Sequence, residues 1–110
     1  MSSRGPNIAP LSIRNSVRTG THTLALTGEL DIDSASKLEK AVREVCASGS
    51  GLVIDLRKVT FMDSTGLRVL IVAGALCEEK GHELRIIPGE DIQRILETTG
   101  LDRVLPFTSR

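Results

Sequence analysis

The stretch F-M-D-S-T-G-L, residues 61–67, stands where an apolar, strand-like run ends and a helix-like run begins. Serine is among the best helix N-caps, because its hydroxyl can accept a hydrogen bond from a backbone N–H of the first turn. The stretch therefore predicts that Ser64 caps a helix. A hydroxyl at a helix N-terminus is also a good place to carry a phosphate, because the helix dipole favours negative charge there. Both interpretations require a strand-to-helix junction at this point.

Upstream of the junction, the sequence predicts two strands and a helix. Leu11, Ile13 and Val17 fall on alternate positions, as in a half-buried strand, and a second strand over residues 24–26 continues toward Gly28. Two short strands this close together favour an antiparallel hairpin at one edge of a sheet.

A loop, G-E-L-D at residues 28–31, then leads into an amphipathic helix. Asp33 or Ser34 can cap this helix, and residues 49–51 end it.

Downstream of this helix, the sequence predicts strands at 52–56 and 84–87 and helices at 65–80 and 90–99, with residues 57–62 crossing to the junction. The first of these helices is apolar almost all round, so we expect it to be the most buried one. Gly81 and Gly100 are well placed to end the two helices. Strand and helix alternate after the hairpin. The order predicts an α/β domain with a small, mainly parallel mixed sheet, an N-terminal edge hairpin and flanking helices.

The length of the chain limits its organisation. With 110 residues it is large enough for one core, so we expect a single domain over residues 11–107 after a loosely packed tail at 1–10. The expected domain ends with an apolar patch of Leu101, Val104, Leu105 and Phe107.

The charge pattern argues against several kinds of partner. The 14 basic residues are balanced by 14 acidic ones, and aromatic residues make up only 2%, so there is neither an electrostatic footprint for nucleic acid nor a platform for base stacking. The first ten residues lack the apolar segment of a signal peptide, and no apolar run approaches the ~18 residues of a membrane span. We therefore expect a cytoplasmic protein that binds neither nucleic acid nor membrane directly.

The sequence offers no catalytic or metal site. It contains no G-x-x-x-x-G-K-[ST] or G-x-G-x-x-G phosphate loop, and no nucleophile elbow surrounds Ser64. His22 and His82 fall in predicted turns without a nucleophile to activate. Together with Cys46 and Cys77 they are too few and too scattered for a metal site. We expect two buried thiols, with a disulfide between the helices as the less favoured alternative, and neither a catalyst nor a cofactor.

Four separated pieces of the sequence resemble the anti-sigma factor antagonists of the STAS domain family. They are G-E-L-D at 28–31 with Ala35 and Leu38, L-V-I-D-L at 52–56, M-D-S-T-G-L at 62–67, and Gly100-Leu101 before Phe107. The resemblance runs from about residue 11 to residue 107. A D-S-[ST]-G-L element after a strand, about thirty residues beyond G-E-L-D, is a specific combination, whereas either piece alone is weak.

The resemblance implies a phosphoswitch. In such families the serine directly after the motif aspartate, here Ser64, is phosphorylated by a partner that is both an anti-sigma factor and an ATP-dependent serine kinase. The unphosphorylated protein binds this partner and frees the sigma factor, the phosphorylated protein does not bind, and a serine phosphatase resets the cycle. The kinase would hold the ATP, which agrees with the missing phosphate loop. Thr65 is the competing phosphoacceptor, and a Ser64 that only caps the helix is the structural alternative.

The resemblance also implies a set of partner-binding residues. They are Asp31, Asp63, Ser64, Thr65, Gly66, Leu67 and Arg68. Asp31 should lie near Ser64 on the kinase-binding surface, or should only shape its loop. Relatives commonly have glycine at the position of Arg68. We hypothesise that Arg68, four residues after Ser64, pairs with the phosphate or contacts the partner, the alternative being a solvated helix residue.

Two other functional classes stay open at this point. A STAS domain can be a subunit of a lipid- or anion-transport assembly, or a scaffold module of a stress-signalling complex. Neither role needs phosphorylation. The sequence also leaves a homodimer open.

Overall fold

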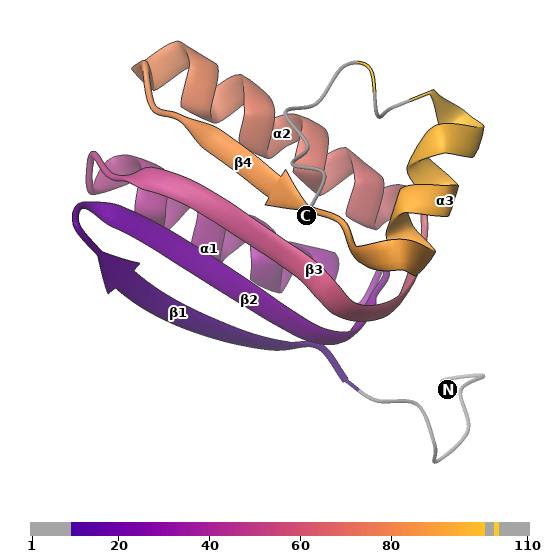
Figure 1. Ribbon diagram of the computed structural model, residues 1–110. Helices are drawn as coiled ribbons and strands as arrows, with labels where there is room; N and C mark the ends of the chain where they lie inside the picture. The colour runs from indigo at the N-terminus through magenta and orange to yellow at the C-terminus, as the bar shows by residue number, and fades with distance from the viewer. Residues whose placement is uncertain (1–9, 101–102, 104–110) are drawn as a thin grey trace.

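The computed structural model describes residues 10–100 and 103 (Figure 1). Within these residues, the strands are β1 (Ser12–Arg18), β2 (Thr21–Leu30), β3 (Gly51–Met62) and β4 (Leu84–Ile87). The helices are α1 (Ala35–Ala47), α2 (Ser64–Lys80) and α3 (Gly89–Thr99). Residues 1–9 of the expected tail and the expected apolar patch of Leu101, Val104, Leu105 and Phe107 lie outside the described residues.

The strands form one mixed sheet in the order β1-β2-β3-β4. β1 and β2 are antiparallel and joined by a tight turn, in which Thr19 and Gly20 have φ angles of 51° and 77°. Positive φ at both positions of a two-residue turn matches the twist of antiparallel strands. β2, β3 and β4 are parallel. These pairings confirm the predicted mainly parallel sheet with an N-terminal edge hairpin. β1 is more exposed than predicted, since Val17 is 61% exposed.

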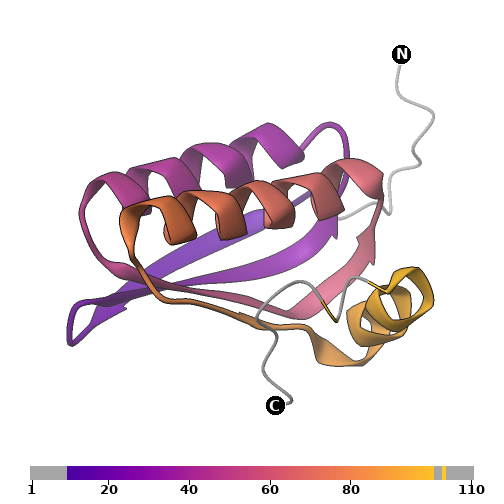
Figure 2. The same cartoon turned by 90° about the horizontal axis from the view of Figure 1, so that it is seen from above.

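Two helices cover one face of the sheet. Figure 2 shows α1 and α2 side by side on that face, and α3 on the other side, at one end of the sheet. The core is aliphatic, as the low aromatic content requires. Fully buried members come from every strand but β1 and from both covering helices: Leu24, Leu38, Ile54, Leu70 and Ile86. Figure 1 views the sheet from the face that α1 and α2 leave open.

The two central strands are longer than the sequence predicts. Residues 28–30 belong to β2 rather than to a loop, and residues 57–62 complete β3 rather than crossing to the next helix. Pairing continues as far as Leu30 and Met62, because two register shifts absorb irregularities along the way. Both strands therefore end side by side, each directly before an aspartate.

The prediction that α2 is the most buried helix is wrong, because five of its 17 residues are buried, against five of the 13 residues of α1. The buried residues of α2 lie along one side: Gly66, Val69, Leu70, Ala73 and Cys77. The opposite side faces outward, and Ile71 is 46% exposed there. In the part of the chain that the structure describes, no further layer packs over α2, so its outer apolar residues stay at the surface.

The predicted helix ends and buried thiols are confirmed. Gly81 and Gly100 end α2 and α3 with φ angles of 72° and 78°. Cys46 on α1 and Cys77 on α2 are buried free thiols whose Sγ atoms lie 3.8 Å apart. Burial, together with the neighbouring thiol, raises the pKa of Cys77 to about 12. This thiol therefore stays protonated and unreactive at neutral pH.

Candidate functional site

The carboxyl ends of the parallel strands β2 and β3 meet at one edge of the sheet. Leu30 pairs with Met62, and the backbone N–H of Asp63 donates a hydrogen bond of 3.2 Å to the carbonyl of Leu30. The loop after β2 and the start of α2 are therefore in contact. Asp31 and Ser64, two of the predicted site residues, lie in these adjoining segments.

The start of α2 is capped by Asp63. Its Oδ1 accepts hydrogen bonds from the backbone N–H groups of Thr65 and Gly66, at 2.9 and 3.2 Å, and from the Thr65 hydroxyl. Aspartate caps helices as well as serine does, and β3 runs on to Met62, so the first residue after the strand takes this role. The prediction that Ser64 is the cap is therefore wrong. Ser64 is the first residue of the helix.

The cap favours the ionised form of Asp63. Partial burial raises the pKa of this carboxyl, but the hydrogen bonds that it accepts from the Thr65 hydroxyl and from the N–H groups of Gly66, Thr65 and Ile32 outweigh burial and lower the pKa. The first turn of α2 therefore carries a negative charge, which the helix dipole also favours.

The hydroxyls of Ser64 and Thr65 are in different situations. Ser64 is exposed, and no described residue forms a hydrogen bond with its hydroxyl. Thr65 is half-buried, and its hydroxyl donates to Oδ1 of Asp63. Of the two hydroxyls, that of Ser64 is the more accessible to an approaching enzyme.

Of the three predicted site residues that follow Thr65, two pack inside the protein and one lies at the surface. Gly66 is buried, and a Cβ there would lie 2.7 Å from Cγ of Met62 and 2.8 Å from Cγ of Leu30. Its missing side chain lets the first turn of α2 lie directly on the ends of β2 and β3. Leu67 packs against the core, whereas Arg68 is exposed, one turn beyond Ser64 on the same side of the helix.

Asp31 lies close to this site but is only 3% exposed. Its Oδ1 accepts a hydrogen bond of 3.0 Å from the N–H of Asp33 and lies 3.2 Å from the Ser34 hydroxyl. That hydroxyl lies 2.9 Å from the carbonyl of Glu29 and accepts a bond of 3.0 Å from the N–H of Asp31. These contacts favour the loop-shaping alternative for Asp31 over direct contact with a partner. Ser34 stands at the N-cap position of α1 but makes no side-chain capping bond.

Two apolar side chains beside the site were not anticipated from the sequence. Ile32, in the loop after β2, is 71% exposed, and Ile71, two turns beyond Ser64 on α2, is 46% exposed. Together with Ser64 and Arg68 they form what we call the Ser64 surface. An isoleucine between two aspartates is the sequence signal for Ile32. Ile71 gives no such signal, because it lies in a helix that is apolar almost all round.

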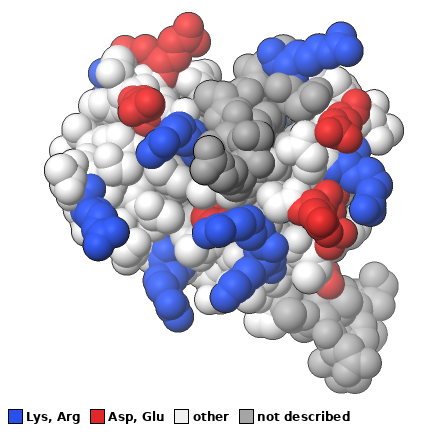
Figure 3. Space-filling model, in the orientation of Figure 1, with Lys and Arg blue, Asp and Glu red and all other residues white. Residues whose placement is uncertain are grey.

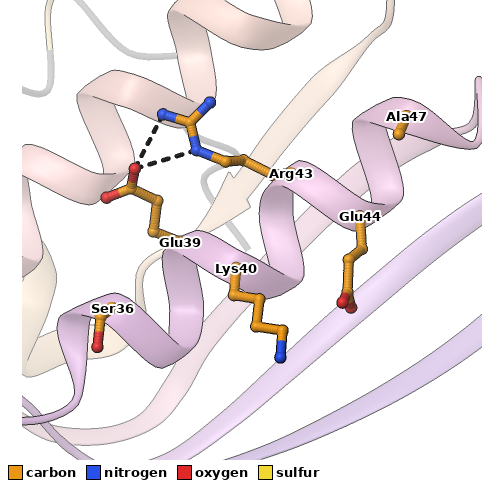
Figure 4. A pocket seen from close by; sticks show the side chains of 6 residues that line it. All are labelled: Ser36, Glu39, Lys40, Arg43, Glu44 and Ala47. Atoms are coloured by element: carbon orange, nitrogen blue, oxygen red, sulfur yellow. Dashed lines mark hydrogen bonds and ion pairs between the residues drawn. The ribbon is translucent and has the colours of Figure 1, made fainter.

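A separate hollow of about 520 Å³ lies along the exposed side of α1, lined by Ser36, Glu39, Lys40, Arg43, Glu44 and Ala47. Figure 4 shows Glu39 and Arg43 turned toward each other, joined by an ion pair of 2.9 Å, with Lys40 and Glu44 pointing to the other side. None of the predicted site residues lines this hollow.

Among the described residues there is no group of three or more histidine, cysteine or acidic side chains placed to hold a metal ion. Across the same residues, no helix combines the length and apolar character needed to cross a membrane.

Comparison with known proteins agrees with this fold. Residues 15–106 match the family described as Mlab, STAS domain. The anti-sigma-F factor antagonist RsfB of Mycobacterium tuberculosis is 36% identical over 107 residues, which cover 92% of this chain and 85% of RsfB. The crystal structure of an anti-sigma factor antagonist from Mycobacterium paratuberculosis superposes with a TM-score of 0.80 and 30% identity, covering 94% of this chain and 91% of that one.

The Bacillus cell fate determinant SpoIIAA in its phosphorylated form superposes with a TM-score of 0.69 over 90% of this chain and 93% of its own. At 16% identity this likeness concerns the fold alone. The family match over most of the sequence is a stronger finding. The chain belongs to the STAS domain family and is similar, within it, to the anti-sigma factor antagonists.

Proposed function

We propose that the protein is a cytoplasmic anti-sigma factor antagonist in which Ser64 is the phosphoacceptor. The unphosphorylated form binds an anti-sigma factor that is also a serine kinase and so frees a sigma factor. Transfer of the γ-phosphate of ATP to Ser64 ends this binding, and a serine phosphatase restores it. The protein itself acts by binding and not as an enzyme, and its partner holds the ATP.

The observation that carries this proposal is the exposed hydroxyl of Ser64 between two side chains that are already engaged. Asp63 uses its carboxylate to cap α2, and the Thr65 hydroxyl donates to that carboxylate. A kinase can thus reach Ser64 without disturbing the cap, whereas phosphorylation of Thr65 would break a capping contact. The names of the antagonist relatives support the same function.

The surroundings of Ser64 explain how one phosphate could end binding. A phosphate adds about −1.5 to −2 charges, next to the ionised Asp63. The N–H groups of Thr65 and Gly66 already donate to Asp63, so the phosphate would compete with that carboxylate for them. We therefore expect the phosphate to stay largely at the surface and to leave the fold intact.

The apolar part of the Ser64 surface gives the unphosphorylated form something to bind with. Ile32, whose backbone N–H bonds to Asp63, and Ile71, two turns beyond Ser64 on α2, are both exposed, and a partner that docks here would bury them. Burying a dianion beside them without compensating hydrogen bonds costs several kcal/mol. The same surface therefore favours binding before phosphorylation and opposes it afterwards.

Arg68 lies close enough to Ser64 to influence the effect of the phosphate on partner binding. It is exposed, one turn from Ser64 on the same side of α2, which is the spacing at which helix side chains interact. We propose that Arg68 contacts the phosphate or the docked partner. Three other predicted contact residues contribute through packing and not through direct contact with the partner. Asp31 stabilises the loop after β2, and Gly66 and Leu67 pack the first turn of α2 against the sheet.

The test is to incubate the protein with the anti-sigma kinase of its own bacterium and magnesium-ATP, and to map the modified residue by mass spectrometry. We expect a single phosphate on Ser64. Ser64→Ala should remain unmodified and still bind the kinase, and Ser34→Ala, the control at the neighbouring junction, should be modified normally. A phosphate on Thr65, or normal phosphorylation of Ser64→Ala, would refute the assignment.

A further inference from the structure

The face of the sheet that α1 and α2 do not cover carries a second cluster of polar side chains. Unlike the Ser64 surface, it lies on the strands and is rich in cations. Side chains on a strand alternate between faces, so the residues between the core positions point to this open side. The pairing places Arg14 beside Ala25 and Ala25 beside Asp55. It also places Ser12 and Lys58 on either side of Thr27. Two neighbouring rows of side chains thus run across β1, β2 and β3.

These rows create a hollow because of the sizes of their side chains. The middle strand contributes the small residues Ala25 and Thr27, whereas the outer strands contribute long side chains such as Arg14 and Lys58. Since adjacent strands lie ~4.8 Å apart, the two walls stand roughly 10 Å apart. The resulting pocket has a volume of about 220 Å³. Its lining consists of Ser12, Arg14, Ala25, Leu26, Thr27, Asp55, Arg57 and Lys58.

The pocket is strongly cationic although the whole chain has a formal net charge of zero. Three of its lining residues, Arg14, Arg57 and Lys58, are cations, and Asp55 is the one carboxylate among them. Figure 3 shows Lys and Arg side chains gathered over the lower middle of this face.

Asp55 is already neutralised by its neighbour. Nε and Nη2 of Arg57 donate to its two carboxylate oxygens at 3.0 and 2.8 Å, and this bonding lowers the pKa of Asp55. Arg14 and Lys58 therefore face the hollow with two positive charges that no lining carboxylate balances.

We propose that this pocket binds a small anion of the phosphate class, such as inorganic phosphate, pyrophosphate or the phosphate end of a small metabolite. Arginine and lysine side chains with two hydroxyls, those of Ser12 and Thr27, supply the charge-assisted hydrogen bonds that tetrahedral oxyanions accept. A dianion balances both unpaired cations, whereas a single carboxylate would leave one of them. The volume is below the ~300 Å³ at which drug-sized ligands begin, and the lining has no aromatic ring for a base to stack on.

The test is a titration of the full-length, ¹⁵N-labelled protein with inorganic phosphate and then pyrophosphate, at constant ionic strength set with chloride. We expect saturable shifts of the backbone amides of Thr27 and Lys58, with a dissociation constant on the order of 1 mM or below. The double variant Arg14→Gln/Lys58→Gln should weaken binding roughly tenfold or more. The control Arg43→Gln/Arg94→Gln removes the same charge from α1 and α3 and should bind as wild type does.

Several outcomes would overturn the proposal. One is the absence of saturable shifts up to about 20 mM phosphate. Another is equal weakening in both double variants, which would show a response to net charge alone. Shifts centred on the first turn of α2 would place the anion there instead, and tighter binding of an oligoglutamate peptide than of pyrophosphate would indicate an acidic protein partner. Because all the changed residues are exposed and lie off α2, none of these outcomes decides whether Ser64 is phosphorylated.

Discussion

Two of the strand-to-helix junctions at the carboxyl edge of the sheet, those after β2 and β3, use aspartate and serine in opposite ways. After β2, Asp31 is buried and its carboxylate and backbone contact Ser34, whose hydroxyl also reaches the carbonyl of Glu29. After β3, Asp63 bonds to backbone N–H groups and Ser64 stays exposed. The first pair builds a loop and the second presents a hydroxyl. A serine near an aspartate is therefore accessible for modification when the aspartate finds other partners.

The largest expected effect comes from placing a permanent charge at the exposed junction. Ser64→Asp should weaken binding to the anti-sigma factor roughly 100-fold, which corresponds to about 2.7 kcal/mol. The added carboxylate lies next to the ionised Asp63, and both its desolvation and this repulsion oppose docking. The thermal midpoint of the variant should stay close to that of the wild type. Isothermal titration calorimetry and differential scanning calorimetry measure the two quantities.

Removing the serine hydroxyl at the other junction should give the reverse result: a loss of stability with little loss of affinity. Ser34→Ala removes a hydroxyl with several partners, so we expect a loss of about 1–3 kcal/mol in the free energy of unfolding and little change in affinity of the folded protein. If Ser64→Asp binds the partner with wild-type affinity, the proposed difference between the two junctions is refuted.

The second prediction compares the two aspartates. Asp31→Ala should cost about 2–3 kcal/mol of unfolding free energy, because it removes a buried hydrogen-bond acceptor and leaves its donors without a partner. Asp63→Ala should cost less, about 1 kcal/mol, the usual value for a helix N-cap. Urea unfolding followed by circular dichroism gives both numbers. A greater loss for Asp63→Ala would mean that the exposed junction is the one that holds the fold.

The third prediction concerns the pH dependence of the cap. Because the pKa of Asp63 is lowered in the folded protein, its ionised form stabilises the fold above the unfolded pKa of about 3.9. This contribution is lost as the pH falls through the lower, folded pKa. Asp63→Asn keeps a capping side chain without the charge, so it should be about 0.3–1 kcal/mol less stable than the wild type at pH 6, with the difference shrinking toward pH 2. If the stability difference between the wild type and Asp63→Asn does not change with pH, the charge of Asp63 does not contribute to the cap.

The smallest expected effect tests Arg68 in the phosphorylated protein. If Arg68 pairs with the phosphate, Arg68→Ala should lower the stability of the phosphorylated form by about 0.2–1 kcal/mol and speed its dephosphorylation about twofold. The unphosphorylated form should be unaffected. Arg94→Ala, which removes the same charge from α3, is the control. Unchanged stability and dephosphorylation in Arg68→Ala would leave Arg68 as a partner contact or a solvated residue.

Local sequence patterns predicted the order of the elements, the hairpin and the glycine helix ends, because each depends on nearby residues. The strand ends were harder to predict. Residues 28–30 contain a glycine and a charge, which favour a loop, yet pairing with β3 keeps them in the sheet. The paired residues lie about thirty positions apart in the sequence, so the pattern of neighbouring residues cannot predict this pairing.

The site was predicted in part for the same reason. The motif located the junction, but Asp63 and Ser64 are both good caps, and only the end of β3 decides which of them follows the strand. The exposure of Ile71 was not predicted, because the apolar periodicity of α2 has no clear polar side. How many layers pack over a helix depends on the whole fold, so its exposure became known from the structure.

The close contact at Gly66 has a consequence for the speed of the proposed switch. With its first turn seated directly on Leu30 and Met62, α2 has little room to move closer to the sheet if Ser64 gains or loses a phosphate. We therefore expect no slow inward shift of α2 between the proposed chemical event and the change in affinity. The response time of the circuit would be set by the turnover of the kinase and the phosphatase, and by the rate at which the partner dissociates.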